Sequence, residues 1–407
     1  MKRRDWIRSP LLALALGTAL AAAQAQEAPK SIRIGWSLSK SGPLAAPADT
    51  TVRPNYEMWV REVNAAGGLM LKAYGKRIPI EVVEYDDRSS TEEAVRAVER
   101  LITQDKVDLL LPPVATGLNI AVAPTFAKHG MPHLGATVTT ERAPELAKRW
   151  PGLFFMLGVP GMYADALMEQ LDAARKAGKI GDKIAMVHVA DAFGVENATA
   201  ARKAAAKHGF RLVLDKSYPM GSQDLSPLLN EVKSLEPDAF VAFSYPPDTI
   251  LLSDQARVVA FNPKVFFSGV GTQFPFFRAK YGAGAEGQMG LGGIDGESPR
   301  MKDYVARFKA GTGKDPENWA SPVTWASLQV LQQAIERVGK IDREAIIKDI
   351  KANSFETVLG PIKFDNQVLN SGIFLIGQWQ GAVFQGIAPG NKPGAKPAVI
   401  PKPAWKQ

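Results

Sequence analysis

The sequence predicts an α/β protein with two lobes, each built on a sheet whose core strands are parallel. Short apolar runs rich in β-branched residues alternate with longer amphipathic stretches, a rhythm typical of parallel strands covered by helices on both faces. The 407 residues suffice for two such units, since a domain averages about 100–200 residues. Breaks rich in glycine or proline at residues 153–158, 284–293 and 357–366 predict three crossings between the lobes, which together act as a hinge.

The predicted strands are short and apolar, and amphipathic helices separate them. In chain order the strands are Ile32–Trp36, Ile78–Tyr85, Val107–Leu111, Met131–Leu134, Ile184–Val189, Arg211–Leu214, Ala239–Phe243 and Lys264–Phe267. The helices between them include Asn55–Ala65, Thr91–Gln104, Tyr163–Ala177 and Val195–His208.

The C-terminal part of the chain follows a different pattern. A long helix is predicted over Pro322–Val338, with Ser321 as its N-cap and proline in its first position. Two further strands are predicted at Thr357–Phe364 and Ile373–Trp379, joined by a turn that contains an Asp-Asn pair.

These elements divide the chain into lobes at the three crossings. We assign residues 31–155 and 292–358 to the first lobe, and residues 156–291 and 359–387 to the second. Residues 388–407 form a tail rich in proline and lysine, and such a composition cannot fold alone.

The N-terminus has the three parts of a cleaved export signal. Lys2, Arg3 and Arg4 precede the apolar run Leu11–Ala23, and Ala23-Gln24-Ala25 offers the pattern of small residues at which signal peptidase cleaves. The apolar run is shorter than the ~20 residues that span a bilayer. We therefore predict a signal peptide at residues 1–25 and an exported product.

Composition excludes several classes of chemistry. Apolar residues make up 46% and charged residues 22% of the chain, which is typical of a globular protein. Cysteine is absent, so there can be no disulfide, thiol nucleophile, iron–sulfur cluster or cysteine zinc site. The net charge of +8 is dispersed among acidic residues, without a basic stripe or interleaved aromatic residues, so we expect no nucleic-acid partner.

The motifs of enzymes are also missing or out of context. Residues 282–287 match the spacing G-x-G-x-x-G, but they follow a helical segment instead of a strand, so a connecting loop is the better interpretation. Each of the four histidines has a structural interpretation, and acidic pairs such as Asp86 and Asp87 stand where capping is common. We expect no catalytic residue, no metal and no cofactor.

Three loops at the carboxyl ends of predicted strands are rich in small and hydroxyl residues. They cover residues 37–46, 112–117 and 135–140, and Thr116 is placed to cap a following helix. Any one of them could be an ordinary cap, but three on one sheet edge predict an uncharged receptor for a carboxylate. Phe193, Tyr245 and residues 270–277 supply aromatic side chains from the second lobe, although Phe276 and Phe277 could equally be core residues.

Several motifs in order resemble the leucine/isoleucine/valine-binding protein family, over Ile32–Gln380. They are Ser41-Gly42-Pro43, Val63-Asn64-Ala65-Ala66-Gly67-Gly68, Glu84-Tyr85-Asp86-Asp87, Gly135-Ala136-Thr137, Asp191-Ala192-Phe193-Gly194 and the segment Trp319–Leu331. The resemblance implies the type I periplasmic binding fold, with two Rossmann-like lobes joined by a three-strand hinge. It also implies a periplasmic monomer that binds a small-molecule ligand between the lobes and docks on the membrane permease of an ABC importer.

The resemblance also assigns residues to the ligand site. In the first lobe it implies Leu44, Val114, Ala115, Thr116, Gly135, Ala136 and Thr137. In the second lobe and at the crossings it implies Phe193, Tyr245, Val270, Gly271 and Trp319.

One departure from the family bears on the ligand. Val270 stands where amino-acid receptors of the family place an acidic residue, and a buried ammonium without that partner would lose several kcal/mol. This favours an aromatic or hydrophobic carboxylate, while a branched-chain or other hydrophobic amino acid stays open. A ligand-sensing subunit of a membrane receptor is a second interpretation, and an exported α/β hydrolase is a third, which lacks a visible nucleophile or metal cluster.

Overall fold

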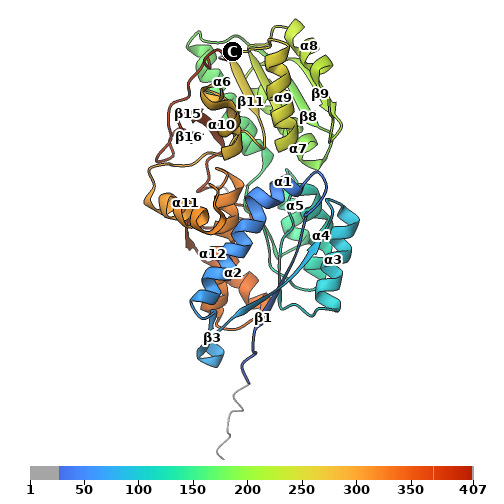
Figure 1. Cartoon of the computed structure of the whole chain (residues 1–407), viewed down its shortest axis with the longest axis vertical. Helices are drawn as coiled ribbons and strands as arrows, with labels where there is room; N and C mark the ends of the chain where they lie inside the picture. The colour runs from blue at the N-terminus through green and yellow to red at the C-terminus, as the bar shows by residue number, and fades with distance from the viewer. Residues whose placement is uncertain (1–26, 370, 406–407) are drawn as a thin grey trace, which may run out of the picture.

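The computed structural model describes residues 27–369 and 371–405, which form two lobes stacked along the long axis (Figure 1). The signal peptide predicted at residues 1–25 lies outside the described residues. The predicted α/β architecture, with two parallel-core sheets and three connecting segments, is confirmed. Within the described residues, no helix is both long enough and apolar enough to cross a membrane.

The first lobe is centred on β1, which is buried along most of its length. Strand β1 (Ile32–Leu38) lies between β4 (Ile80–Asp86) and β5 (Leu109–Leu111), and all three are parallel. A separate parallel pair is formed by β6 (His133–Gly135) and β7 (Leu153–Phe155). Because the strands are parallel, the loops that follow β1, β5 and β6 leave from the edge that faces the second lobe (Figure 1).

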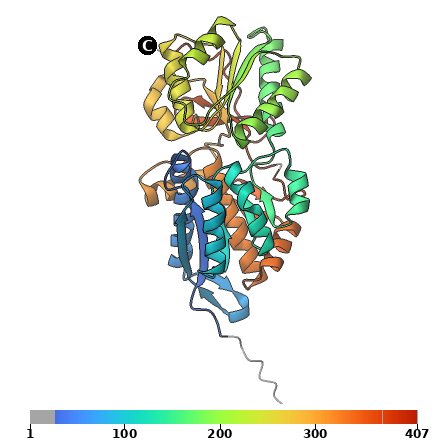
Figure 2. The same ribbon diagram turned by 90° about the vertical axis from the view of Figure 1, so that its right-hand side faces the viewer.

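Helices cover this sheet, and three of them come from the C-terminal part of the chain. The helices α12 and α13, orange in Figure 2, pack with the blue and cyan N-terminal half. The first-lobe helices are α1 (Ala45–Pro47), α2 (Arg53–Ala65), α3 (Thr91–Thr103), α4 (Thr116–Lys128), α5 (Ala143–Arg149), α11 (Pro299–Thr312), α12 (Ala320–Val338) and α13 (Arg343–Ala352). Two hairpins complete the lobe, β2 (Leu69–Leu71) with β3 (Lys76–Ile78), and β13 (Phe355–Thr357) with β14 (Gly360–Ile362).

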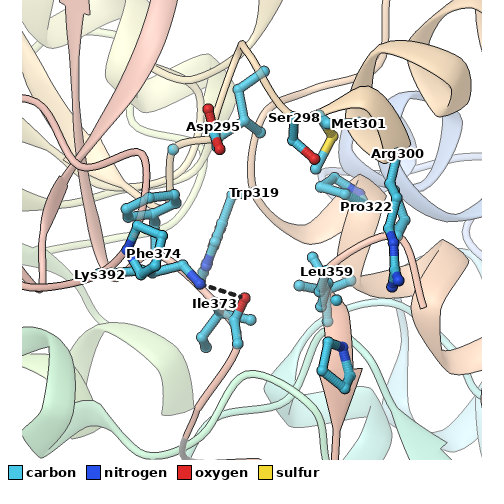
Figure 3. A pocket seen from close by; sticks show the side chains of 18 residues that line it. Asp295, Ser298, Arg300, Met301, Trp319, Pro322, Leu359, Ile373, Phe374 and Lys392 are labelled. Carbon is cyan, nitrogen blue, oxygen red and sulfur yellow. Dashed lines mark hydrogen bonds between the residues drawn. The ribbon is translucent and has the colours of Figure 1, made fainter. Parts of the chain in front are cut away.

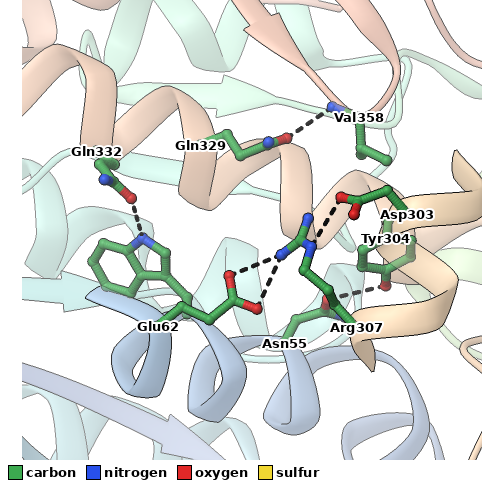
Figure 4. Close-up of polar contacts among 9 residues, drawn as sticks. Asn55, Glu62, Asp303, Tyr304, Arg307, Gln329, Gln332 and Val358 are labelled. Carbon is green, nitrogen blue, oxygen red and sulfur yellow. Dashed lines mark hydrogen bonds and ion pairs between the residues drawn. The ribbon is translucent and has the colours of Figure 1, made fainter. Parts of the chain in front are cut away.

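Polar contacts tie α2, α11 and α12 together (Figure 4). The Arg307 guanidinium on α11 donates to the Glu62 carboxylate on α2 at 2.8 Å. The Trp59 indole on α2 donates to Gln332 Oε1 on α12 at 3.0 Å. These bonds join segments that are far apart in the sequence, so α11 and α12 belong to the first lobe although they follow the second lobe along the chain.

The second lobe contains a seven-stranded sheet in the order β16-β15-β12-β11-β10-β8-β9. Its core is parallel, while β15 and β16 run antiparallel at one edge. The strands are β8 (Lys183–Val189), β9 (Arg211–Tyr218), β10 (Ala239–Phe243), β11 (Val265–Ser268), β12 (Met289–Leu291), β15 (Ile376–Gln380) and β16 (Val383–Ala388). The helices around it are α6 (Pro160–Lys176), α7 (Ala192–Lys207), α8 (Ser226–Ser234), α9 (Pro246–Val258) and α10 (Pro275–Tyr281).

The third crossing lies later than the sequence analysis placed it. The predicted strand at 357–364 is the hairpin of β13 and β14, because Gly360, at a φ of +95°, lets the chain reverse after Thr357. Farther along, the Leu369 N–H donates to the Phe155 carbonyl at 2.9 Å. Residues 359–369, assigned to the second lobe from the sequence, therefore pack on the first.

The C-terminal tail is packed against the second lobe, although its described part after β16 contains no helix or strand. The Lys402 N–H donates to the Lys264 carbonyl at 2.8 Å. The ring of Trp405 lies 5.2 Å from that of Phe266. The composition predicts that the tail does not fold alone, and here the second lobe supplies its packing contacts.

Candidate functional site

A small cavity, here the cleft cavity, lies where the two lobes meet, and its volume is about 40 Å³. Eight of the twelve site residues named in the sequence analysis line it, which are Val114, Ala115, Thr116, Thr137, Phe193, Tyr245, Val270 and Trp319. The polar loops of the first lobe and the aromatic side chains of the second lobe thus line the same cavity.

Four of the named residues do not line the cavity. Leu44 is buried ahead of α1, and Pro47 at the end of that helix lines the cavity instead. Gly135 and Ala136 pack beneath the loop after β6, where a Cβ on Gly135 would come within 2.3 Å of Val138. Gly271 faces Pro246 and Thr249 on α9.

The cavity also contains residues that the sequence analysis did not assign to it. They are Thr51, Thr139, Leu157 and Ala320. Thr139 could have been found, because it stands two residues after Thr137 in the same loop. No local pattern marks the other three, since Thr51 lies in a helical turn, Leu157 in a crossing and Ala320 at a helix start.

A strained residue shapes the first-lobe side of the cavity. Ala115 has φ 69° and ψ 154°, a conformation that is essentially restricted to glycine and costs about 1–3 kcal/mol. Thr137 holds it there, because Thr137 Oγ1 accepts the Ala115 N–H at 3.0 Å. Backbone strain of this kind is typical of functional sites, where the surrounding structure compensates for its cost.

Thr116 does not cap α4, contrary to the sequence-based prediction. Its hydroxyl lies 3.3 Å from the Thr139 N–H and 3.4 Å from the Thr139 carbonyl oxygen, so it joins the loops after β5 and β6. Helix α4 begins after Ala115 without a side-chain cap. The first N–H groups of this helix have no intrahelical partners and lie at the positive end of its dipole, next to the cavity.

The second lobe contributes two aromatic rings that contact each other at a tilt. The ring centroids of Phe193 and Tyr245 are 5.2 Å apart with an interplanar angle of 34°. The Tyr245 hydroxyl donates to Asp191 Oδ2 at 2.9 Å, and the other oxygen of this carboxylate accepts the Gly194 N–H at the start of α7. Burial raises the pKa of Tyr245 well above its ordinary value. The phenol therefore stays neutral, and its oxygen can only accept a hydrogen bond from the cavity.

Trp319 is held by the crossings between the lobes. Its indole N–H donates to the Tyr163 hydroxyl at 3.2 Å, and that hydroxyl donates to the Leu157 carbonyl at 2.8 Å. The other side of the side chain packs on Gly292 in the second crossing, where a Cβ would come within 2.3 Å of Trp319 Cβ. The position of this ring thus depends on two crossings and on α6.

The buried carboxylate of Glu317 sets the start of α12. It accepts the Trp319 N–H at 2.8 Å and also the Ser321 N–H. Ser321, predicted as the N-cap, lies inside the first turn, where its hydroxyl bonds Tyr304 and Asn55 at 2.8 Å each. The helix therefore begins earlier than predicted because an acidic side chain from the preceding turn satisfies its N–H groups.

The cleft cavity is electrically neutral. No ionised side chain is among the described residues that line it, and Asp191, the carboxylate behind Tyr245, is not one of them. The described part of the chain also contains no cluster of three acidic or histidine side chains that could hold a metal ion. The N–H groups at the start of α4 can bind an anionic head, and the rings can hold an apolar body.

Comparison with known proteins places the chain among solute-binding proteins. A family model described as periplasmic binding protein matches residues 31–380. The Leu/Ile/Val-binding protein homolog 7 of Brucella suis is 25% identical, covering 90% of this chain and 94% of its own length. A solute-binding protein of an ABC transporter from R. palustris, solved in complex with benzoate, has a TM-score of 0.75 at 20% identity, covering 92% and 97% of the two chains. The branched-chain amino acid transporter substrate-binding protein LivJ from Streptococcus pneumoniae was solved in complex with isoleucine. It has a TM-score of 0.71 at 22% identity, and the match covers 85% of this chain and 99% of LivJ.

Proposed function

Because this chain belongs to the periplasmic binding protein family, we propose that it holds a small organic acid between its lobes. The family consists of solute-binding proteins of transporters, so the chain is a binding protein and not an enzyme. The observation that supports the ligand class is the neutral cleft cavity, whose lining combines Thr116 at the start of α4 with the rings of Phe193 and Tyr245.

The lining of this cavity suits an aromatic or hydrophobic carboxylate better than an amino acid. A carboxylate can be held by N–H groups and hydroxyls without a cation. An ammonium would need a carboxylate, and no carboxylate is among the described residues that line the cavity. The benzoate complex of one structural relative agrees with the first ligand class, whereas the isoleucine complex of another keeps a branched-chain amino acid as the second candidate.

Export and delivery complete the proposal. The protein would be secreted by cleavage of residues 1–25, act as a monomer in the periplasm and dock on the permease of an ABC importer. The cleft cavity of about 40 Å³ has room for only a few water molecules. Ligand entry therefore requires the lobes to part at the crossings, and a ligand that contacts both lobes favours the closed arrangement.

Isothermal titration calorimetry on the mature chain tests the ligand class. We expect benzoate to bind and benzamide, which lacks the charge, to bind much more weakly. Leucine and isoleucine are expected to bind more weakly than benzoate, because the cavity offers the ammonium no ionised partner. Tighter binding of leucine than of benzoate would show that the second ligand class is the correct one.

Thr137→Ala is expected to weaken benzoate binding by about 1–3 kcal/mol, because the Ala115 N–H loses its acceptor and the strained loop shifts. Titration calorimetry measures the change. Thr103→Ala, which removes an exposed hydroxyl on α3, is the matched control and should bind as the native protein does. Equal affinities of the two variants would remove Thr137 from the site.

Val270→Glu is expected to weaken benzoate binding by about tenfold or more, because it brings a negative charge into the cavity that repels the benzoate carboxylate. The matched control is Val270→Gln, which has the same size without the charge. The ratio of benzoate to leucine affinity should fall in the glutamate variant only. A fall of the same size in both variants would show that volume, not charge, controls binding at this position.

A further inference from the structure

A second and larger cavity of about 380 Å³ lies behind Trp319, and we call it the hinge cavity (Figure 3). Its lining includes Asp295, Arg300 and Met301 in or near α11, together with Leu359 in the turn between β13 and β14. Phe374, Lys392 and neighbouring residues close it from the other side. The proposed ligand site in the cleft uses none of these residues.

Both lobes contribute to the hinge cavity. Met301 and Leu359 belong to the first lobe, as their helix and hairpin show. Phe374 packs on Gly386 of β16 in the second lobe, where a Cβ would come within 2.3 Å of the ring. Lys392 follows β16 in the tail, and its N–H donates to the Pro389 carbonyl at 3.1 Å. A molecule in this cavity would therefore touch both lobes at once.

Lys392 is the basic group that this cavity leaves uncommitted. Its ammonium donates one hydrogen bond to the Gly372 carbonyl at 3.2 Å and lies 5.0 Å from the Phe374 ring. A lysine ammonium has three N–H donors, so others remain for a ligand. Among the described residues no carboxylate is within ion-pair distance of it, and Asp295 acts only from farther away. Arg300, by contrast, is paired with Glu356 at 2.7 Å.

The rest of the lining is mostly apolar. Met301, Leu359, Ile373 and Phe374 face the cavity, as Figure 3 shows for the labelled side chains. Burial lowers the pKa of the Lys392 amine because the ammonium has lost part of its hydration. A bound anion would offset that loss of hydration free energy by its attraction to the ammonium.

The other charged side chains of the lining are engaged, since Asp295 Oδ1 accepts the Glu297 N–H at 3.0 Å and Arg300 is paired with Glu356. Apolar walls around the half-buried Lys392 ammonium are complementary to a small molecule with an apolar body and one negative charge.

We propose that the hinge cavity is a second binding site, which takes a small aliphatic or aromatic monocarboxylate with its charge on Lys392 and its body against Phe374 and Leu359. The binding step itself does not depend on the function proposed for the cleft. Trp319 lines both cavities. Because a molecule that touches both lobes favours one lobe arrangement, occupancy of the hinge cavity changes the affinity of the cleft, and this coupling rests on the proposed function.

Hexanoate is the probe for the second site, measured by ligand-observed NMR titration on the mature chain. We expect saturable binding that Lys392→Met weakens by about tenfold or more, because methionine keeps much of the apolar stem and removes the charge. Lys396→Met removes a charge of the same sign from the exposed part of the tail and should bind hexanoate as the native protein does. Hexanamide should bind at least about tenfold more weakly than hexanoate.

Three results would overturn the site. They are equal binding of hexanoate to Lys392→Met and the native protein, equal binding of hexanamide and hexanoate, and loss of hexanoate binding in Thr137→Ala but not in Lys392→Met. The last result would place hexanoate in the cleft. Failure of benzoate to bind the native protein would count against the proposed function only.

The coupling is tested by measuring benzoate affinity with and without saturating hexanoate. We expect hexanoate to change the dissociation constant of benzoate in the native protein, and not in Lys392→Met. A change of equal size in both proteins would mean direct competition in the cleft, and no change in the native protein would mean that the cavities are independent. Either outcome would overturn the coupling.

Discussion

Replacing Gly292 by alanine is expected to abolish measurable ligand binding in the cleft. Gly292 has a φ of +88°, and an added Cβ would come within 2.3 Å of Trp319 Cβ and 2.5 Å of Cδ1. Its N–H is held by the Leu375 carbonyl at 2.9 Å, so the backbone cannot easily retreat. The indole must therefore move, and Trp319 lines the cleft cavity. Titration with benzoate should show no heat of binding at concentrations that saturate the native protein.

The matched control for this substitution is Gly313→Ala at the end of α11. Gly313 also has a positive φ, +71°, but a Cβ there would meet nothing within 4 Å. It carries the same cost of about 1–2 kcal/mol for a left-handed residue, without the collision. The control should bind benzoate normally at reduced stability. Normal binding by Gly292→Ala would show that the position of Trp319 does not control the site.

Replacing Glu317 by alanine is expected to lower the free energy of unfolding by about 2–4 kcal/mol, measured by urea denaturation at pH 6. The side chain is only 1% exposed, and the N–H groups of Trp319 and Ser321 would lose their acceptor in a buried position. Glu344→Ala removes an exposed acid from the first turn of α13 and should change stability by less than about 0.5 kcal/mol. Similar small losses in both variants would contradict the role given to Glu317.

The same carboxyl group makes stability depend on pH. Burial raises the pKa of Glu317 from 4.5 to about 8, so between these values the folded state binds more protons than the unfolded state. Stability is therefore greatest at low pH within this window and falls as the pH rises from about 5 to about 8. Asp248, 3% exposed and with its pKa raised to about 6, adds to the slope in the lower half of the window. Denaturation at several pH values should show a flatter profile for Glu317→Gln, and an unchanged profile would exclude Glu317 as the source.

Part of the candidate site could be predicted because it follows a rule of parallel sheets. Thr116 and Thr137 come directly after predicted strands, and parallel strands place such loops on one edge. Phe193 and Tyr245 follow strands of the second lobe in the same way. The cavity residues Leu157 and Ala320 follow no such rule, because their place depends on how the chain passes between the lobes. The family resemblance implied Gly135 as a site residue, but Gly135 packs against Val138 instead.

The start of α12 shows why helix ends near the site were hard to place. Serine followed by proline is a sound signal for a helix start, and it is present at Ser321. The signal failed because Glu317, four residues earlier, satisfies the first N–H groups and releases the serine to bond Tyr304 and Asn55. Those two partners lie on α11 and α2, and no local window of sequence contains them.

Local sequence patterns suffice to predict the alternation of strands and helices, the presence of two lobes, and the polar and aromatic loops that face each other. Those features depend on residues a few positions apart, which a local pattern records. Three other features arise from tertiary packing alone: Thr116 bridges two loops, Asp191 bonds to Tyr245, and Trp319 lines two cavities. Each of these depends on contacts between segments distant in sequence, whose relative positions follow from the packing of the whole core.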